Sequence, residues 1–448
     1  MKRFLGTLTG KSIFLAEKVM RYNASSFPGK LVLKLFPDYL KKVEYPPLVI
    51  MVTGSCGKGS TTKIIAEALR ACGKTVAHNL EGSNLLNGVA STVVKNVGFS
   101  GKMKQDVLVL ETDERYLKFI TKYIEPDYLV INNLTRDQPP RQGDFDIVFK
   151  EILKAIPKKT HLIVNGDDPI TRKYSLYTDN KITFFGIDRN FMSYDRDIDD
   201  VRDYNYCPRC SAKLEYKYRH YGSVGEFSCP KCGFARKDID FAVTAVDEKT
   251  GELTINNSQK IKANELILFN IYNIIAAYSV LSLCGENSKK TVKAISKVHI
   301  GGKIYTEIVK NGRKYTALNC KAENNATYNL SVIYTALDKG PKTIVLGLRE
   351  ISRRYEFFDL SWLYDIDFEL LNDGSIENVV CAGPYRYDFA VRMLIAGVPE
   401  EKLIILDTLD HAGEVFDKQT KGNVYGILNF DYIPPFINSV NEIKEEEK

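Results

Sequence analysis

The stretch PPLVIMVTGSCGKGSTTKIIAEALRACG, residues 46–73, decides the fold of this 448-residue chain. It opens with an almost wholly apolar run, which is typical of a strand buried on both faces of a parallel sheet. A glycine-rich loop follows, and the apolar residues after the loop have helical spacing. Backbone N–H groups at the start of such a helix face anions, so the stretch predicts a phosphate-binding loop.

The loop itself indicates which residues would hold ATP. Its glycines let the backbone approach phosphate oxygens, and Lys58 can reach the β- and γ-phosphates and offset charge during phosphoryl transfer. A hydroxyl from Ser60 or Thr61 can support Mg²⁺. The predicted ATP-binding residues of the loop are Gly54, Gly57, Lys58, Gly59, Ser60 and Thr61.

Further apolar runs alternate with helical stretches along the chain. They lie at 106–111, 127–134, 160–168, 342–348, 377–383 and 402–407. The alternation predicts parallel sheets with crossover helices, so the expected fold class is α/β. Glu111 ends the first of these runs at the carboxyl edge of the sheet, where its carboxylate suits Mg²⁺.

Three regions are expected. Residues 1–45 form a helical lead-in, residues 46–305 a central ATP-binding domain, and residues 306–448 a smaller C-terminal α/β domain. A cysteine-containing insert interrupts the central domain at about 203–237. The uncharged segment 266–285 is predicted to be a strand end followed by a buried helix, because Asn270 and Asn273 interrupt it and no second span accompanies it.

The composition is that of an ordinary folded protein. It is 44% hydrophobic and 26% charged, which excludes disorder and fibrous architectures. Lys and Arg number 62 against 56 Asp and Glu, a net charge of +6 that suits an anionic substrate or a membrane face but is too small to indicate nucleic acid. The stretch MKRFLGTLTGKSIFLAEKVM at 1–20 predicts an amphipathic helix, packed on the protein or lying on a membrane surface. Its apolar residues at helical spacing are Phe4, Leu5, Leu8, Ile13, Phe14 and Val19.

Four of the nine cysteines form two Cys-x-x-Cys pairs: Cys207, Cys210, Cys229 and Cys232. Two such turns can place four thiolates around one tetrahedral ion, which predicts a structural zinc site with no open coordination position. A redox dithiol, a rubredoxin-like iron site and a nucleic-acid-binding ribbon are the competing interpretations. The other cysteines are isolated, so the chain is expected to work in a reducing, cytoplasmic compartment.

Several motifs resemble those of Mur-type ATP-dependent ligases and their folylpolyglutamate synthase relatives. The loop at 53–61 is similar to their TGxxGKxST loop, with Gly59 more like the folate enzymes. INNLTRDQPPRQGDFD at 131–146 is similar to their NLTRDHLDRHG segment, with Gln138 in place of the usual His. FNIYNIIAA at 269–277 resembles HNxxNxLAA, which implies nucleotide contacts by Asn270 and Asn273, and EGSNLLNG at 81–88 implies that Ser83 helps to hold Mg²⁺.

With the cysteine ribbon inserted in such a domain, the whole chain resembles the MurT family, the ligase subunits of lipid II isoglutaminyl synthases. DLSWLYDIDFELL at 359–371 and GPYRYDFAVRMLIAGV at 383–398 resemble C-terminal signatures of that family, whereas 321–329 and 348–359 depart from its pattern. The resemblance implies ATP-dependent amidation of the α-carboxylate of D-glutamate in the lipid II stem peptide. It implies an acyl phosphate intermediate, D-isoglutamine as product, and ATP, Mg²⁺ and structural Zn²⁺ as cofactors.

Ammonia must then come from elsewhere, because none of the five histidines lies in a recognisable glutaminase context. The resemblance implies a GatD-type glutamine amidotransferase as the partner in a heterodimer. An aspartate of the C-terminal domain would complete that partner's Cys–His pair by orienting the histidine. Asp359 is the first candidate, and Asp365 and Asp367 are the alternatives. Work at the inner face of the cell membrane, with peripheral contact at most, follows from the lipid-linked substrate.

Two other functions remain open at this point. A folylpolyglutamate synthase-like or other amino-acid-adding Mur-type ligase would need no glutaminase partner. A non-catalytic nucleotide-binding homologue would bind ATP without turnover, and the altered runs at 321–329 and 348–359 motivate that alternative.

Overall fold

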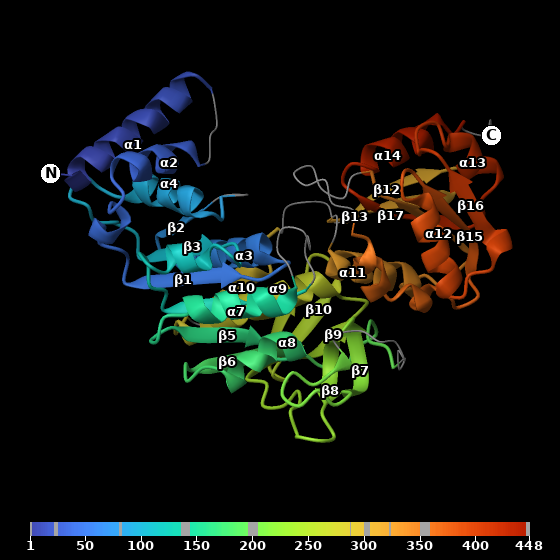
Figure 1. The fold of residues 1–448 in the computed structure, drawn as a ribbon, viewed down its shortest axis with the longest axis horizontal. Coiled ribbons are helices and arrows are strands. Elements are labelled where there is room, and N and C mark those ends of the chain that lie inside the picture. Colours follow the sequence, from blue (N-terminus) through green and yellow to red (C-terminus); the bar gives the residue numbers. More distant parts are fainter. Residues whose placement is uncertain are drawn as a thin grey trace.

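A computed structural model describes residues 2–21, 26–79, 83–135, 144–195, 205–286, 288–299, 305–321, 324–349 and 359–444. Gln138, part of the predicted insert at 203–204, residues 322–323 and residues 350–358 of the altered C-terminal runs lie outside these ranges. Two separate sheets form the cores of the molecule, and the N-terminal helices lie at the edge of the first, away from the second (Figure 1).

The first sheet has nine strands in the order β11-β10-β9-β6-β5-β4-β1-β3-β2. The strands from β2 to β9 in this order are parallel, and β10 and β11 continue the sheet as antiparallel neighbours. The strands are β1 (Leu48–Thr53), β2 (Val76–His78), β3 (Val107–Glu111), β4 (Tyr128–Ile131), β5 (His161–Asn165), β6 (Ile182–Ile187), β9 (Phe241–Asp247), β10 (Glu252–Ile255) and β11 (Gln259–Lys262).

Helices cover both faces of this sheet, as the apolar strands require. Ile50 and Val52 of β1 pack into one core with α3 and α9, whereas Val49 and Met51 pack into the other with α4 and α7. Alternate residues of a strand point to opposite faces, so β1 belongs to both cores. The helices are α3 (Lys58–Ala71), α4 (Leu86–Asn96), α5 (Leu117–Ile120), α7 (Phe145–Ala155), α8 (Pro169–Arg172), α9 (Leu268–Leu283) and α10 (Ser288–Ile295).

The uncharged segment 266–285 is a buried helix, as predicted, because α9 packs in the interior beneath the sheet. The prediction that a strand ends just before this helix is wrong. Ile267 has extended backbone dihedrals, but β11 already ends at Lys262, and no strand pairs with Ile267 in the part of the chain that the structure describes. No described helix is both long enough and apolar enough to cross a bilayer.

The second sheet lies in the C-terminal part of the chain and has the order β12-β13-β17-β14-β15-β16. Only the β12–β13 pair is antiparallel. Three of the predicted runs, 342–348, 377–383 and 402–407, correspond to β14, β15 and β16. The elements are β12 (Tyr305–Lys310), β13 (Arg313–Cys320), α11 (Asn325–Leu337), β14 (Lys342–Gly347), β15 (Ile376–Ala382), α12 (Arg386–Ile395), β16 (Leu403–Leu406), α13 (Gly413–Lys418), β17 (Asn423–Asn429) and α14 (Ile433–Glu442).

The cysteine-containing insert forms a hairpin of β7 (Glu215–Tyr221) and β8 (Val224–Ser228) beside the first sheet. Its strands form a two-stranded sheet of their own, and single bridges join Arg219 of β7 to Tyr194 and Ser228 of β8 to Ala235. β7 also contacts α11 of the C-terminal part, which places the insert between the two larger units (Figure 1).

The lead-in consists of α1 (Lys2–Val19), α2 (Phe27–Leu35) and a short 3₁₀ turn at Leu40–Lys42. The helix predicted within 1–20 is confirmed as α1, but its inward face is not the expected apolar one. Gly6, Thr7 and Gly10 are buried, whereas Phe4 and Leu8 are exposed. A side chain at Gly6 would collide with Tyr39, and small residues therefore let α1 approach its neighbours closely.

Candidate active site

The phosphate loop begins α3 at the carboxyl end of β1, and two of its glycines are sterically required. Gly57 has a φ of +81°, and a Cβ added there would lie 2.2 Å from Asn273 Oδ1. Gly54 has a φ of +133°, and a Cβ added there would lie very close to the backbone of Asn133. Only glycine adopts these conformations without strain, so the loop backbone is held in one shape.

Asparagines from neighbouring elements clamp the loop. Asn133, after β4, accepts a hydrogen bond from the Cys56 N–H at 2.9 Å. Asn132 donates to Thr61 Oγ1 at 3.0 Å, and that hydroxyl donates to Asn273 Oδ1 at 3.1 Å. The Thr61 hydroxyl is therefore used inside the protein, and Asn273 of α9 holds the loop rather than facing outward.

Ser60 is better placed than Thr61 to meet a ligand. Its side chain is half-buried, whereas Thr61 is completely buried. Within the described ranges, the Ser60 hydroxyl has no hydrogen bond to the protein. Of the two hydroxyls that the sequence offered for Mg²⁺, the structure leaves Ser60 available.

Lys58 folds back over the loop toward a carboxylate that sequence reasoning missed. Its ammonium contacts the carbonyl oxygen of Gly54 and lies 2.9 Å from Glu114 Oε1. Both side chains of the pair are largely buried, 11% and 3% exposed, so solvent screens the pair only weakly. Glu114 follows β3 within the sequence ETDE. Because it is far from Lys58 along the chain, the sequence did not indicate this contact.

Glu111 lies next to the loop at the end of β3. A Cβ on Gly59 would be 3.2 Å from Glu111 Oε2, so a residue without a side chain suits this position. Asn84 donates to Glu111 Oε1 at 3.0 Å, which orients the carboxylate. Asn79 bonds the N–H and the carbonyl of Glu111 and also donates to the Ser83 carbonyl, so one side chain fixes the backbone at two of the predicted magnesium ligands.

A pocket lies beside the start of α9. Asn270 and His299 line it together with Ile64 of α3 and Asn264. Asn270 is buried, and its Oδ1 has no hydrogen-bond partner among the described residues, while its Nδ2 lies 3.4 Å from Glu265 Oε2. An unpaired buried amide oxygen is costly, so a donor group in this pocket would be bound favourably.

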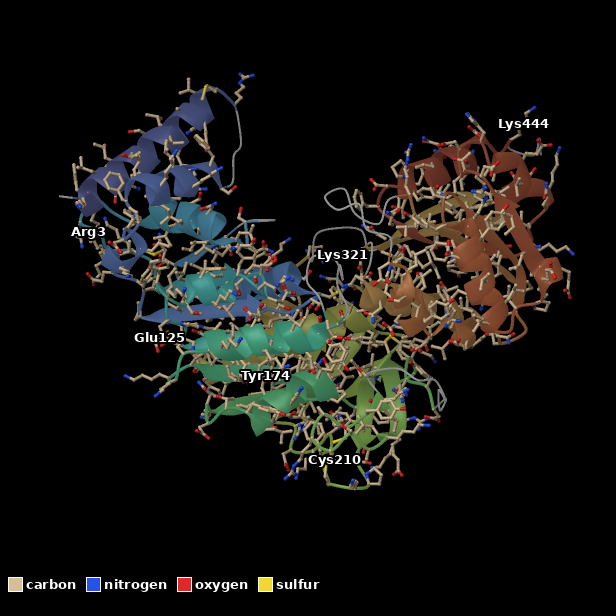
Figure 2. The ribbon with its side chains drawn as sticks, in the orientation of Figure 1. Arg3, Glu125, Tyr174, Cys210, Lys321 and Lys444 are labelled. Atoms are coloured by element: carbon tan, nitrogen blue, oxygen red, sulfur yellow. The ribbon has the colours of Figure 1, made fainter. Side chains whose placement is uncertain are left out.

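The four paired cysteines converge in the insert. Their sulfur atoms all lie within 4.8 Å of one another, with Cys207–Cys232 and Cys210–Cys229 each at 3.5 Å. Four sulfurs at Zn–S distances of about 2.3 Å would be about 3.8 Å apart, so the cluster fits a tetrahedral zinc ion. Figure 2 shows Cys210 at the outer edge of the molecule, whereas Lys321 lies near the junction of the two larger units. The outer position of the cysteine cluster agrees with a structural role for its metal.

The insert is fastened to the central domain by a buried carboxylate. Arg236 binds Asp167 through Nε at 2.6 Å, and Tyr272 of α9 donates to the other Asp167 oxygen at 2.9 Å. Asp167 also accepts the Ile187 N–H at 2.7 Å. One side chain therefore joins the insert, the end of β6 and α9.

The same insert reaches the C-terminal domain through Asp367. Asp367 Oδ2 accepts hydrogen bonds from the Tyr194 hydroxyl at 2.5 Å and from the Gly222 N–H at the hairpin tip at 3.0 Å. Asn329 of α11 accepts the Asp367 N–H and donates to the Asp365 carbonyl. Asp367 is completely buried and Asp365 nearly so, and neither carboxylate faces the outer surface as a partner contact would require.

Asp359 has a different setting. It is only half-buried and precedes a short 3₁₀ helix, η4 (Ser361–Asp365), whose Ser361 N–H it binds at 2.8 Å. The bond spans two residues, the pattern of an Asx turn, and the N-cap of η4 is Leu360, which makes no side-chain cap bond. A carboxylate fixed by one oxygen at an accessible place can still offer the other oxygen to a second protein.

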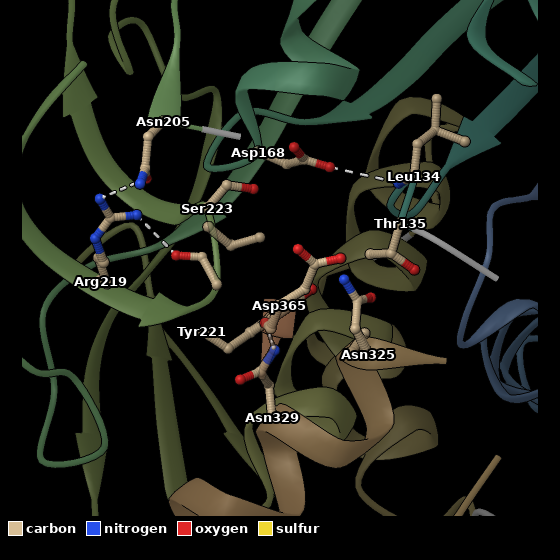
Figure 3. A pocket seen from close by; sticks show the side chains of 13 residues that line it. Leu134, Thr135, Asp168, Asn205, Arg219, Tyr221, Ser223, Asn325, Asn329 and Asp365 are labelled. Atoms are coloured by element: carbon tan, nitrogen blue, oxygen red, sulfur yellow. Dashed lines mark hydrogen bonds between the residues drawn. The ribbon is translucent and has the colours of Figure 1, made fainter. Parts of the chain in front are cut away.

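The two domains meet beside the phosphate loop. Cys56 of the loop contacts Asn324 Oδ1 at 3.1 Å, which brings the altered run 321–329 to the nucleotide site. Next to this contact, residues of the central domain, the insert and α11 enclose a small pocket (Figure 3). Arg219 and Asn325 line it, as does Asp168, whose pKa burial raises to about 7.

Comparisons with known proteins agree with this architecture. A family model for the Mur ligase middle domain matches residues 52–219, and one for the MurT ligase C-terminal region matches residues 322–432. The pseudomurein peptide ligase type C of Methanothermus fervidus superposes with a TM-score of 0.66 at 18% identity, covering 93% of this chain and 84% of that one. MurF of Thermotoga maritima, solved with ADP, gives 0.56 at 17% identity, covering 93% and 83%. Fold and phosphate loop thus define a Mur-type ligase.

Two curated relatives extend over nearly the whole chain. One is the MurT subunit of the glutamine-hydrolyzing lipid II isoglutaminyl synthase of Staphylococcus aureus (strain COL), 27% identical over 95% of both chains. The other is the corresponding subunit of Streptococcus pneumoniae (strain ATCC BAA-255 / R6), 29% identical over 96% of this chain and 95% of the relative. The chain is therefore similar to MurT subunits over nearly its whole length, and its C-terminal region matches the MurT model.

Proposed function

We propose that this chain is the ligase subunit of a lipid II isoglutaminyl synthase, which uses ATP to amidate the α-carboxylate of D-glutamate in the lipid II stem peptide. One observation carries the proposal. The phosphate loop of a Mur-type domain directly contacts, through Cys56 and Asn324, a C-terminal domain of the MurT type. This contact supports a site shared by the nucleotide and the acceptor.

The proposed reaction has two steps. A carboxylate oxygen of the substrate bonds to the γ-phosphorus of ATP while the bond between that phosphorus and the β–γ bridging oxygen breaks, which releases ADP. Ammonia then bonds to the acyl carbon, the bond to the phosphate oxygen breaks, and the nitrogen loses a proton. A carboxylate is a poor electrophile until phosphate is attached as a leaving group, so ATP is required.

The side chains around the loop have separate roles in this scheme. Lys58 would leave Glu114 and turn to the β- and γ-phosphates, where its charge stabilises phosphoryl transfer. Asn270 would accept a hydrogen bond from the amino group of the nucleobase, since its Oδ1 is buried and unpaired among the described residues. Asn273 and Thr61 act as positioning residues, because they bond to each other.

Mg²⁺ and Zn²⁺ are the proposed ions. Ser60, Ser83 and Glu111 would hold Mg²⁺, and the Glu111 carboxylate beside Gly59 suits such a hard cation. When bound, Mg²⁺ neutralises charge on the phosphates. Cys207, Cys210, Cys229 and Cys232 would hold Zn²⁺, whose closed Cys₄ site has a structural role.

We further propose that ammonia comes from a GatD-type glutamine amidotransferase bound to the C-terminal domain, with Asp359 completing its Cys–His pair. The similarity to these relatives supports a second subunit, since both relatives are named as subunits of glutamine-hydrolyzing synthases. Arg392 of α12 bonds the Leu363 carbonyl of η4, so these two elements are neighbours. Their exposed apolar residues offer a docking surface near Asp359: Tyr364, Tyr387, Val391, Leu394 and Ile395.

A reconstituted reaction tests the proposal. The chain, a glutaminase partner, glutamine, ATP and lipid II are combined, and mass spectrometry follows the small mass decrease when a hydroxyl becomes an amino group. Omission of the partner should abolish the product unless ammonium is supplied. Addition of a whole amino acid would instead indicate an amino-acid-adding ligase. ATP binding without turnover in the complete mixture would indicate a non-catalytic homologue.

A further inference from the structure

The outward face of α1 is apolar and largely exposed, with Phe99 as a neighbour of Phe4 at one end. Phe4, Leu8, Leu15 and Val19 recur at the spacing of one helix face and are 48%, 43%, 65% and 76% exposed. Such an outward stripe is unusual on a helix whose opposite face already packs on α2 and α4. In Figure 2, Arg3 at the start of α1 lies at the outer edge of the molecule, on the side away from the C-terminal domain.

The net positive charge of the chain is concentrated in the N-terminal residues that include α1. Residues 1–45 contain nine Lys and Arg residues against three Asp and Glu residues, a net charge of +6. The whole chain has 62 against 56, also +6, so residues 46–448 contain 53 of each sign and are neutral as a unit. The only acid of α1 is Glu17, which is buried and whose pKa that burial raises. The exposed charges of α1 are thus all positive.

A cleft at one end of the stripe combines both properties. Lys2, Arg3 and Lys42 line it together with Phe4 and Phe99. The two aromatic rings lie 5.6 Å apart, and the Lys11 ammonium lies 5.9 Å from the centre of the Phe99 ring. Cations around exposed rings suit a phosphodiester with an attached hydrocarbon chain, whereas a protein partner would not require one sign of charge.

We infer that the outward face of α1, with the cleft at Phe4 and Phe99, docks on an anionic phospholipid bilayer. This inference rests on the proposed function, because a lipid-linked substrate requires the enzyme to work at a membrane. The apolar stripe would enter the boundary between headgroups and acyl chains while Lys2, Lys11 and Lys18 face the phosphates. The lead-in would thereby hold the catalytic cleft near its substrate.

Sedimentation with vesicles tests the inference. The full chain should bind vesicles of equal parts phosphatidylglycerol and phosphatidylcholine, and bind pure phosphatidylcholine much more weakly. Leu8→Ser/Leu15→Ser should weaken binding by roughly tenfold or more, because each side chain loses its transfer into the lipid. Lys2→Gln/Lys18→Gln should weaken binding to the anionic vesicles by roughly tenfold without changing binding to neutral ones.

Ile147→Ser/Val309→Ser is the matched control. These residues are 47% and 58% exposed, similar to Leu8 and Leu15, but lie on α7 and β12. The control should bind vesicles as the unmodified chain does. Equal binding by Leu8→Ser/Leu15→Ser and the control would overturn the inference. So would a dimer in solution that Leu8→Ser/Leu15→Ser converts to a monomer without any vesicle binding, since the face would then be an interface between copies.

The two proposals fail separately. Amidation of detergent-solubilised lipid II needs no bilayer, so Leu8→Ser/Leu15→Ser should leave that rate unchanged. Normal amidation without vesicle binding by the unmodified chain would overturn the membrane inference alone. Vesicle binding without amidation in the complete mixture would overturn the proposed function and leave the docking face standing.

Discussion

The phosphate loop and Asp359 are held in opposite ways. Asparagines from β4, α9 and α11 contact the loop, and two of its glycines leave no room for a side chain. Asp359 is accessible and is fixed by a single described bond to the Ser361 N–H. The loop is therefore held within one chain, whereas the role proposed for Asp359 needs a second protein.

This difference predicts two separable functions. Changes at the loop should stop every reaction that uses ATP. Changes at Asp359 should stop only the delivery of nitrogen from glutamine.

Lys58→Ala should lower the rate of product formation about a thousandfold, because one buried cation aimed at the phosphates is lost. Glutamine and ammonium should be equally ineffective as nitrogen donors. Lys63→Ala, on the exposed side of the same helix, is the control. ADP release measured at saturating ATP is the readout, and a wild-type rate for Lys58→Ala would refute the role of the loop.

Asp359→Asn should lower the glutamine-driven rate about a hundredfold and leave the ammonium-driven rate unchanged, because only the orientation of the partner's histidine is lost. Asp367→Asn serves as the comparison. It weakens the contact with Tyr194 and Gly222, so both rates should fall together. Equal loss of both rates in Asp359→Asn would argue against the partner role.

Zinc removal should loosen the junction between the domains. Among the described residues, the core of the insert is small, and its buried large apolar side chains are Leu214, Phe227 and Phe234. Binding energies of structural zinc sites are roughly 10 kcal/mol, so the insert should unfold when Cys210→Ser disrupts the site. Hydrogen exchange should then increase in β7 and β8 and also at 365–371, through Asp367. Cys72→Ser should retain zinc and normal exchange, and an unchanged 365–371 segment in Cys210→Ser would contradict the coupling.

Asp168 should give stability a pH dependence. Burial raises its pKa to about 7, above the ordinary value near 4, so the folded protein binds this proton more tightly than the unfolded chain. Its contribution to the free energy of unfolding is therefore greatest at low pH and decreases as pH rises toward 7. Between about pH 5.5 and 8, wild type should lose about 2 kcal/mol relative to Asp168→Asn. If the stabilities of the two proteins changed with pH in parallel, the pKa of the Asp168 carboxyl would not be raised.

Local sequence was sufficient for the features that lie close together along the chain. The strand, loop and helix around Lys58 were predictable because one short stretch encodes all three. The cluster of four cysteines was predictable because each cysteine pair is a local turn. The roles assigned to Ser60, Ser83, Glu111 and Asp359 remain predictions.

Features that depend on which elements become neighbours were not predictable. Glu114 meets Lys58 because β3 lies beside β1 in the sheet, and strand order cannot be derived from a single strand. The burial of Asp367 depends on how the insert docks on α11. For α1, periodicity defined two faces but not which one turns inward, and the small residues Gly6 and Gly10 decided that question by allowing close approach.

Transfer of labelled oxygen tests the central claim most directly. Lipid II carrying ¹⁸O in the α-carboxylate of D-glutamate is converted by the chain, its partner, glutamine and ATP, and the released phosphate is analysed by mass spectrometry. Activation of the carboxylate by ATP predicts one ¹⁸O atom in each phosphate released together with amide. Amide formation with unlabelled phosphate would contradict the account.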